Sequence, residues 1–388
     1  MQDDYGTPEL DENDWKYQPG NDFATDLFKS LRSSHVLEPS DRAVSSHLCD
    51  QCVRFRDEVS SPGFAMSYDM SALRTTAGEK RCDLCILLWQ AAQNGRIETS
   101  TIKFERTGPF LRIESTGPRI LSILRDPEQL LPPTSEFQLG FVGLPEAGCS
   151  THLEVIKYWL SNCDRHHGCK PLEHAATGAK LRLPTRLLDV GNHGDKSVRL
   201  WATTPNDSGE WIALSHRWGL QHLSTTPETL QAHLDGIQLS ALPATFRDAV
   251  TVTRALGRRY LWIDSLCVIQ GPGGDFNTEA KRMEDVYSGA YCVIAASCSA
   301  DHFSGFLKQR NRRSYVGLCR EGKGETPFYV CESIDNFKDH VLDGELNSRG
   351  WVLQEHALAR RTLFFTEHQT YFECGKGVRC ETSTNLSK

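Results

Sequence analysis

The most continuous apolar stretch of the chain covers residues 260–269 and contains one acidic residue, Asp264. Its aromatic and β-branched residues, followed by glycines, are typical of a strand that is buried on both faces, as parallel sheets require. Burial of a carboxylate without a partner would cost several kcal/mol. Asp264 is therefore expected either near the carboxyl end of the strand, where open α/β sheets bind ligands, or as the cap of a neighbouring loop or helix.

Two further apolar runs have the composition of buried strands. They cover residues 211–215 and 291–297, and amphipathic stretches separate them from residues 260–266. Alternation of strands and helices predicts βαβ units, so we expect three neighbouring parallel strands with 260–266 in the interior of the sheet. The predicted fold class is α/β, with a mainly parallel sheet flanked by helices.

Two helices are expected between these strands. Thr245 and Asp248 have the spacing of a capping box, and the apolar positions that follow share one helical face until Gly257. The second helix is predicted from about residue 277 to 288. At about 100° per residue, Glu279 lies in the middle of the apolar face of this helix, where a solvated acid would not be expected.

The pattern divides the chain into four parts. Residues 1–44 are acidic and polar and are predicted to form a mostly disordered tail, with one short helical pattern at 23–31. Residues 45–200 are expected to form a smaller, cysteine-containing α+β region ahead of the main domain. The main domain is expected over residues 208–375, and residues 376–388 are interpreted as a second tail.

The cysteine-containing region has short strand patterns at residues 102–105, 111–114 and 120–124. Turn residues separate these patterns, which predicts an antiparallel meander. A helical pattern at 156–160 and a hairpin pattern over 187–201 follow before the main domain.

Four cysteines of this region form two CxxC pairs, Cys49/Cys52 and Cys82/Cys85, with 29 residues between the pairs. Each pair can present two thiolates to one tetrahedral zinc ion, although the gap is longer than in common zinc ribbons. The alternative is that Cys82 and Cys85 are core thiols one turn apart on a helix. The stretch 163–169 has four potential metal ligands and fits either a zinc loop or a purely structural loop.

Composition limits the partners and the compartment. The 388 residues carry 43 basic and 50 acidic side chains, a net charge of −7, with no basic field for nucleic acid. The longest apolar runs are too short to span a bilayer, and the N-terminus lacks the basic and apolar regions of a signal peptide. We therefore expect a cytoplasmic protein that binds neither nucleic acid nor membrane, whose 14 cysteines are not a disulfide framework.

Several segments carry a family resemblance when they are taken together. The matching segments are 213–219 (ALSHRWG), 242–249 (LPATFRDA), 260–267 (YLWIDSLC) with Gln270, 279–287 and 349–355. In this order they resemble the fungal heterokaryon-incompatibility (HET) domain, over about residues 208–375. The sequence departs from the family pattern at Phe276, where tryptophan is common, and at His216, where tyrosine is common.

The resemblance implies a cytosolic module that triggers growth arrest or cell death after non-self recognition. It also implies a distant relation to TIR domains, which are flavodoxin-like. Some TIR domains self-associate as signalling scaffolds, and others hydrolyse NAD at its nicotinamide bond with one glutamate. Two functions therefore stay open, an NAD glycohydrolase and a non-catalytic oligomerising scaffold, and the non-self partner is unknown. A third possibility is a zinc-dependent interaction protein that recognises its partner through the cysteine-containing region.

The candidate catalytic residues are the two carboxylates Glu279 and Asp264. A carboxylate near the ribose of NAD would stabilise the positive charge that develops as the glycosidic bond breaks. The alternative for Glu279 is a structural role, in which it interacts with the helix dipole and pairs with an arginine such as Arg217 or Arg349.

Four other residues are expected to line the same crevice as binding residues for NAD. Ser215, Arg217 and Trp218 follow the first predicted strand, so that Arg217 could hold a phosphate and Trp218 could stack on a base. Gly273 belongs to a glycine-rich turn whose N–H groups suit an anion. Trp218 fits equally well as an aromatic plug in a turn.

Overall fold

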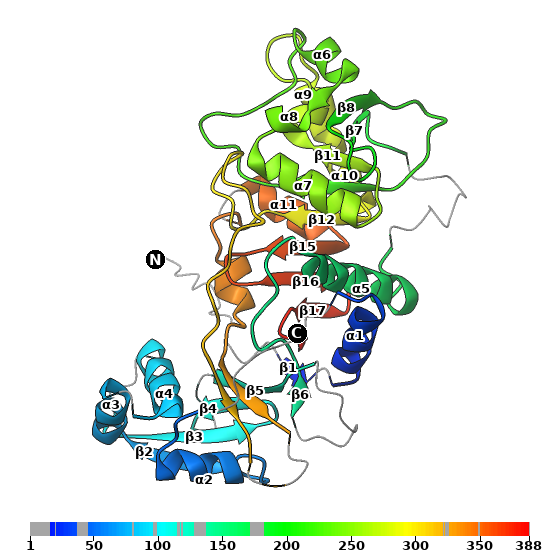
Figure 1. Cartoon of the computed structure of the whole chain (residues 1–388). Helices are drawn as coiled ribbons and strands as arrows, with labels where there is room; N and C mark the ends of the chain where they lie inside the picture. Colours follow the sequence, from blue (N-terminus) through cyan, green and yellow to red (C-terminus); the bar gives the residue numbers. More distant parts are fainter. Residues whose placement is uncertain are drawn as a thin grey trace, which may run out of the picture.

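The computed structural model describes residues 16–19, 21–36, 46–79, 81–95, 99–114, 117, 119–127, 137–170, 182–320, 322, 326–347 and 350–387. Figure 1 shows a large sheet in the upper and middle part of the view and a smaller sheet with its own helices below it.

The large sheet has eleven strands. In spatial order they are β1 (Lys16–Pro19), β18 (Thr384–Ser387), β17 (Gly377–Cys380), β16 (Thr370–Cys374), β15 (Arg361–Phe365), β12 (Cys292–Ala295), β9 (Trp211–Ser215), β11 (Tyr260–Ile263), β7 (Arg186–Asp189), β8 (Ser197–Ala202) and β10 (Ile237–Gln238). The three strands expected from the apolar runs are neighbours and parallel, with β9 between β11 and β12. β11 is interior as expected, but it ends at Ile263, and residues 264–267 are helical.

The predicted mainly parallel, TIR/flavodoxin-like sheet is wrong. Parallel pairing is confined to β11–β9, β9–β12 and β12–β15, and the other described pairs of the large sheet are antiparallel. The physical reason is the length of the connections. Parallel neighbours need a crossover of a dozen or more residues, whereas short turns join β7 to β8 and each strand from β15 to β18 to the next.

The helices have the following bounds in chain order: α1 (Asn21–Ser33), α2 (Asp50–Glu58), α3 (Met70–Gly78), α4 (Asp83–Asn94), α5 (Ser150–His166), α6 (Leu230–Asp235), η2 (Leu239–Ala241), α7 (Ala244–Ala255), α8 (Asp264–Cys267), α9 (Phe276–Glu279), η3 (Ala280–Arg282), α10 (Met283–Gly289), η4 (Lys338–Leu342) and α11 (Gly350–Leu358). The predicted helix at 277–288 is thus divided into α9, η3 and α10. α1 covers the short helical pattern expected at 23–31. Among the described residues, we find no helix with the length and apolar character needed to cross a membrane.

Both faces of the central strands are buried, which explains their unbroken apolar runs. Alternate residues of β9 point to opposite faces. Ile212 packs in one core with Phe246 of α7, and Trp211 packs in another with Tyr287 of α10. The helices on the two faces therefore fix β9, β11 and β12 in place, and with them the loops at their carboxyl ends.

The expected capping box at the start of α7 is not formed. The N-cap residue is Pro243, without a side-chain cap. Thr245 Oγ1 instead donates to the backbone oxygen of Asp301 at 2.8 Å, and Asp248 Oδ2 accepts from the N–H of Phe306 at 2.7 Å. Both side chains anchor the loop that follows β12, a contact that local spacing does not contain. The predicted end of the helix is confirmed, because Gly257 follows α7 with a left-handed φ of 67°.

The smaller sheet contains the expected antiparallel meander. Its strands are, in spatial order, β13 (Tyr315–Leu318), β14 (Phe328–Glu332), β5 (Arg119–Arg125), β4 (Phe110–Ile113), β3 (Thr101–Thr107) and β2 (Ala65–Asp69), with β6 (Gln138–Leu139) paired in parallel to β5. β14 pairs with β5 although about half of the chain lies between them. Helices α2, α3 and α4 pack against this sheet in one apolar core.

Candidate functional site

Asp264 lies at the carboxyl edge of the parallel strands, as the first residue of α8 directly after β11. Its Oδ2 accepts a hydrogen bond from Trp218 Nε1 at 2.8 Å, and its Oδ1 accepts one from the backbone N–H of Ser265 at 2.7 Å. The Asp264 side chain is 20% exposed. The carboxylate is thus held in one orientation and still reaches solvent.

Two buried histidines lie beside Asp264. His302 Nε2 is 2.9 Å from His216 Nε2, and His216 Nε2 is 3.9 Å from Asp264 Oδ1. The backbone N–H of Leu223 donates to His302 Nδ1 at 3.3 Å, so the His302 proton is on Nε2 and His216 Nε2 accepts it. Burial, and then the neighbouring His216, lower the pKa of His302 to about 3. His302 is therefore neutral near pH 7 and hydrogen-bonded to His216.

Two serine hydroxyls complete the polar group at this edge. Ser215 ends β9 and Ser265 follows Asp264, and both side chains are buried. Neither Oγ atom has a hydrogen-bond partner among the described residues. Buried hydroxyls normally have one, so these oxygens are suited to bind water or a ligand.

Sequence reasoning did not identify His302, and it considered His216 only as a departure from the family pattern. A signal was present. Asp264 and His216 directly follow β11 and β9, and His302 follows β12 on the next loop. The carboxyl ends of parallel strands meet at one edge of a sheet, so a histidine after the third strand could have been considered a candidate site residue together with Asp264.

The structure does not bring Glu279 or Arg217 to this group. Glu279 is buried, and its Oε1 accepts from Thr185 Oγ1 at 2.7 Å and lies 3.6 Å from Arg282 Nη1. Arg217 forms an ion pair with Glu345. Glu279 is thus on the buried face of its helix, as its position in the apolar stripe indicated, but its arginine partner is Arg282.

Gly273 lies in a tight turn between α8 and α9. Its φ is 79°, a left-handed conformation that favours glycine, and the N–H of Gly274 donates to Gly271 O at 3.0 Å. The turn is fixed from the next residue, since Asp275 Oδ1 accepts from the N–H of Ile269 at 2.8 Å and Asp275 also pairs with Arg186. The shape of this turn is therefore explained by its own hydrogen bonds.

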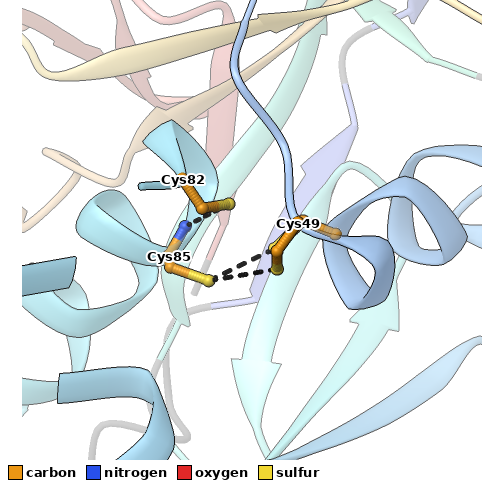
Figure 2. A group of neighbouring side chains, drawn as sticks. Cys49, Cys82 and Cys85 are labelled. Atoms are coloured by element: carbon orange, nitrogen blue, oxygen red, sulfur yellow. Dashed lines mark hydrogen bonds between the residues drawn. The ribbon is translucent and has the colours of Figure 1, made fainter. Parts of the chain in front are cut away.

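The two CxxC pairs meet as the sequence predicted. Cys49 and Cys82 are the N-cap residues of α2 and α4, and Cys52 and Cys85 lie in the first turns. Figure 2 shows Cys82 and Cys85 at the start of α4 pointing toward Cys49. The Sγ atom of Cys85 is 3.7 Å from that of Cys49 and 3.5 Å from that of Cys52, and all four Sγ atoms lie within 4.8 Å of one another.

This geometry fits a tetrahedral zinc ion. Zinc–sulfur bonds of about 2.3 Å place neighbouring sulfurs about 3.8 Å apart. Hydrogen bonds with Cys82 and Cys85, followed by burial, raise the pKa of the Cys52 thiol, while hydrogen bonds with Cys52 and Cys85 lower the pKa of Cys82 to about 2. Thiols this close cannot all ionise by themselves, and a divalent cation stabilises all four as thiolates. The cysteine group is therefore a candidate metal centre.

Fold and site together define a mixed-sheet protein with a polar group at the carboxyl edge of its parallel strands and a four-cysteine candidate metal centre. Residues 211–355 match the family model described as Heterokaryon incompatibility protein (HET). The chain therefore carries a heterokaryon incompatibility domain over this segment, which includes His216, Asp264 and His302. Comparison with curated proteins and with solved structures gave no match.

Proposed function

We propose that the protein is an effector of non-self recognition that leads to cell death, and that it acts by hydrolysing the N-glycosidic bond of NAD with Asp264 as the active carboxylate. The observation that carries this proposal is the hydrogen bond between Trp218 Nε1 and Asp264 Oδ2. It joins a partly exposed carboxylate and an aromatic ring at the edge of the sheet where ligands bind.

Hydrolysis of this bond requires few catalytic groups from the protein. Water adds to C1′ of the ribose, the bond to the nicotinamide nitrogen breaks, and its electron pair neutralises the ring, while a proton from water passes to solvent. The transition state resembles an oxocarbenium ion, so a fixed negative charge stabilises it. His302, which is neutral near pH 7, adds no positive charge that would cancel the charge of Asp264.

Glu279 is the competing carboxylate within the same proposal. Its contacts with Thr185 and Arg282 offset its charge and hold it in the fold. Contacts within the protein also account for Arg217 and Gly273, so we assign neither residue a role in binding NAD. We therefore assign the catalytic role to Asp264 and treat Glu279 as the comparison residue.

Release of nicotinamide from NAD by the purified full chain tests the proposal. Asp264→Asn should lower turnover by about 10²–10³-fold, the usual effect of losing one preorganised electrostatic group. Asp285→Asn, an exposed residue of α10, is the matched control and should retain activity. Killing of host cells on expression should follow turnover across these variants. If Glu279→Gln loses activity at an unchanged melting temperature while Asp264→Asn keeps it, the roles are reversed.

A second candidate function, a self-associating scaffold without catalysis, is favoured by a different observation. Leu220 and Phe303 are 102% and 55% exposed, on the loops that follow β9 and β12. Exposed apolar side chains near one edge suit contact with another protein copy. In this case Leu220→Glu would abolish killing and lower the mass of the assembly in light scattering. NAD turnover would be absent in both wild type and variant.

A further inference from the structure

A second group of metal-binding side chains lies far from the four-cysteine centre, at the end of α5. Cys163 is in the last turn of α5 and His167 is its C-cap residue. The N–H of His167 donates to Cys163 O at 3.0 Å, which continues the helical turn. Residues four apart share a helical face, so the two side chains point in the same direction.

The chain then turns back and adds a third ligand. Gly168 has a φ of 63°, a left-handed conformation that reverses the chain direction after the helix. Cys169 follows at once, and its Sγ lies 3.6 Å from His167 O. Three potential ligands of the stretch 163–169 thus face one point, which a linear sequence motif alone does not guarantee.

The fourth ligand comes from the other end of the chain. Cys374 is the last residue of β16, and a two-residue turn leads to β17 at Gly377, with Cys374 paired to Gly377. The Sγ of Cys374 is 3.4 Å from Nδ1 of His167. A side chain at Gly375 would begin 3.5 Å from the Sγ of Cys169, so the turn lies directly against the stretch 163–169.

We infer that Cys163, His167, Cys169 and Cys374 bind a second structural zinc ion. Their ligand atoms all lie within 4.8 Å of one another. In a tetrahedral site, a sulfur at about 2.3 Å and a nitrogen at about 2.0 Å from zinc are about 3.5 Å apart, close to the distance between Cys374 and His167. Three thiolates and one imidazole are a standard donor set for structural zinc.

Charge and burial fit the same assignment. Cys163 and Cys374 are buried, while His167 and Cys169 are partly exposed, which leaves a path for the ion to enter. Three thiolates around Zn²⁺ leave a net charge of −1. Arg379 of β17 interacts electrostatically with Cys163 and Cys374, and so compensates this charge.

A disulfide is the competing chemistry for these cysteines. It would need two sulfurs, and it would give no reason for a histidine nitrogen and a third thiol to converge on the same point. Cys163, Cys169 and Cys374 are not joined by a disulfide in this structure. The four-fold convergence is what zinc requires.

Such an ion would bind α5, which precedes the family-matched segment, to the β16–β17 hairpin, which follows it. Trp159 of α5 already stacks on Phe372 of β16, with ring centroids 6.2 Å apart. Zinc would lock this contact at the end where α5 stops. Its role is structural, because all four coordination positions are taken by protein side chains.

Elemental analysis of the purified full chain, expressed with zinc supplied, tests the inference. Wild type should carry two zinc ions per chain. Cys163→Ser/Cys374→Ser should lose one of them, and so should Cys49→Ser/Cys52→Ser, which removes the other centre. Cys319→Ser, outside both groups, is the control and should keep two.

A milder variant keeps the test decisive if the serine protein fails to fold. His167→Cys should retain two metal ions, and after cobalt exchange the absorption of this site should change from that of three sulfurs and one nitrogen to that of four sulfurs. Two results would overturn the inference. One is a metal content unaffected by Cys163→Ser/Cys374→Ser, and the other is a mass lower by two hydrogens from a disulfide within this group. If Cys163→Ser/Cys374→Ser lowers the zinc content and Cys49→Ser/Cys52→Ser does not, the result supports the second zinc site and contradicts the four-cysteine centre.

Discussion

His302 Nε2 donates a hydrogen bond of 2.9 Å to His216 Nε2, and both imidazoles are buried behind the carboxyl edge of the parallel strands. The two residues are 86 positions apart in sequence. A proton added to His302 Nδ1 would displace the N–H of Leu223 and place a charge in the core. His302 is therefore stable in this position only in its neutral form.

The first prediction concerns acid stability. The pKa of His302 falls from its ordinary value of 6.5 to about 3 on folding. Between these values the unfolded chain binds one more proton than the folded chain, so stability rises with pH. The free energy of unfolding should decrease by about 1.4 kcal/mol per pH unit as the pH falls from 6.5 toward 3. His302→Asn should flatten this slope in urea unfolding measured at several pH values.

His340 is the control for that measurement. Burial, and then His368, lower its pKa to about 4, so it contributes to the acid slope of wild type in a similar window. His340→Asn should leave the contribution of His302 in place. An acid slope that is the same in wild type and His302→Asn would show that the histidine pair does not govern it.

The second prediction concerns the buried ion pair of Glu381. Arg310 donates to both of its carboxylate oxygens, at 2.6 and 2.7 Å, and the N–H of Thr370 donates to Oε1 at 2.6 Å. Burial by itself raises the pKa of Glu381, but Arg310 and His152 outweigh burial and hold it well below its usual range. Glu381→Gln leaves Arg310 buried without a counter-charge, and should cost about 3–5 kcal/mol.

A double-mutant cycle tests this pairing. Arg310→Met should destabilise the protein by a similar amount, because it isolates Glu381. Glu381→Gln/Arg310→Met removes both charges and should be much closer to wild type than the sum of the single changes. Additive losses in urea unfolding would show that the two residues act independently.

The third prediction concerns the interior strand β11. Ile263 is fully buried in the core beneath α7. Ile263→Asp places an unpaired charge there, and the cost exceeds what a marginally stable domain can tolerate. The variant should be insoluble or lack a cooperative melting transition. Ser240→Asp, on the exposed η2 segment, should melt as wild type does, and a cooperatively melting Ile263→Asp protein would contradict the burial of β11.

The fourth prediction concerns the four-cysteine centre. Cys49 and Cys82 begin the two helices that cover the smaller sheet, so zinc would fix the positions of α2 and α4. Chelation should lower the melting temperature of wild type. Cys49→Ser/Cys52→Ser should have a lower melting temperature before chelation and should respond less to the chelator than wild type does, because only the zinc ion of the second group is left to remove. An equal response of both proteins to the chelator would assign the effect to another site.

The central strands were predictable because each of them buries both faces. β9, β11 and β12 then show up as continuous apolar runs, and their helices as amphipathic stretches. The hydrophobic pattern also predicts the β7–β8 hairpin, but it does not indicate which strand of the sheet the hairpin pairs with. Pairing of β7 with β11 makes the sheet mixed at one border of the parallel strands, as pairing of β16 with β15 does at the other, and backbone hydrogen bonds leave no trace in local hydropathy.

Long-range pairing limited the prediction most strongly at β13 and β14. Val330 of β14 pairs with Ile123 of β5. Both strands are short, and short apolar segments carry little information about their neighbours. The meander over residues 102–124 was predictable from its turns, whereas the strands that complete its sheet were not.

Only those features of the candidate site that lie within one continuous segment of the sequence were predictable. Asp264 stood out because it interrupts an apolar run, and its position after a strand followed from that. The buried position of Glu279 also followed from helical periodicity, but Thr185, its hydrogen-bond partner, lies 94 residues upstream. Helical periodicity identifies the buried face and says nothing about which side chain meets it.

The pairing of β14 with β5 bears on how the family-matched segment can be handled experimentally. Residues 211–355 contain β13 and β14, which belong to the smaller sheet, whose other strands precede residue 211. The same segment lacks β7 and β15, which pair with β11 and β12. A fragment cut at these positions would expose unpaired backbone at both borders of its parallel strands and invite aggregation. Chimaeras between relatives would therefore need to exchange both flanking regions along with the segment, since the boundaries of sequence similarity do not coincide with those of independent folding.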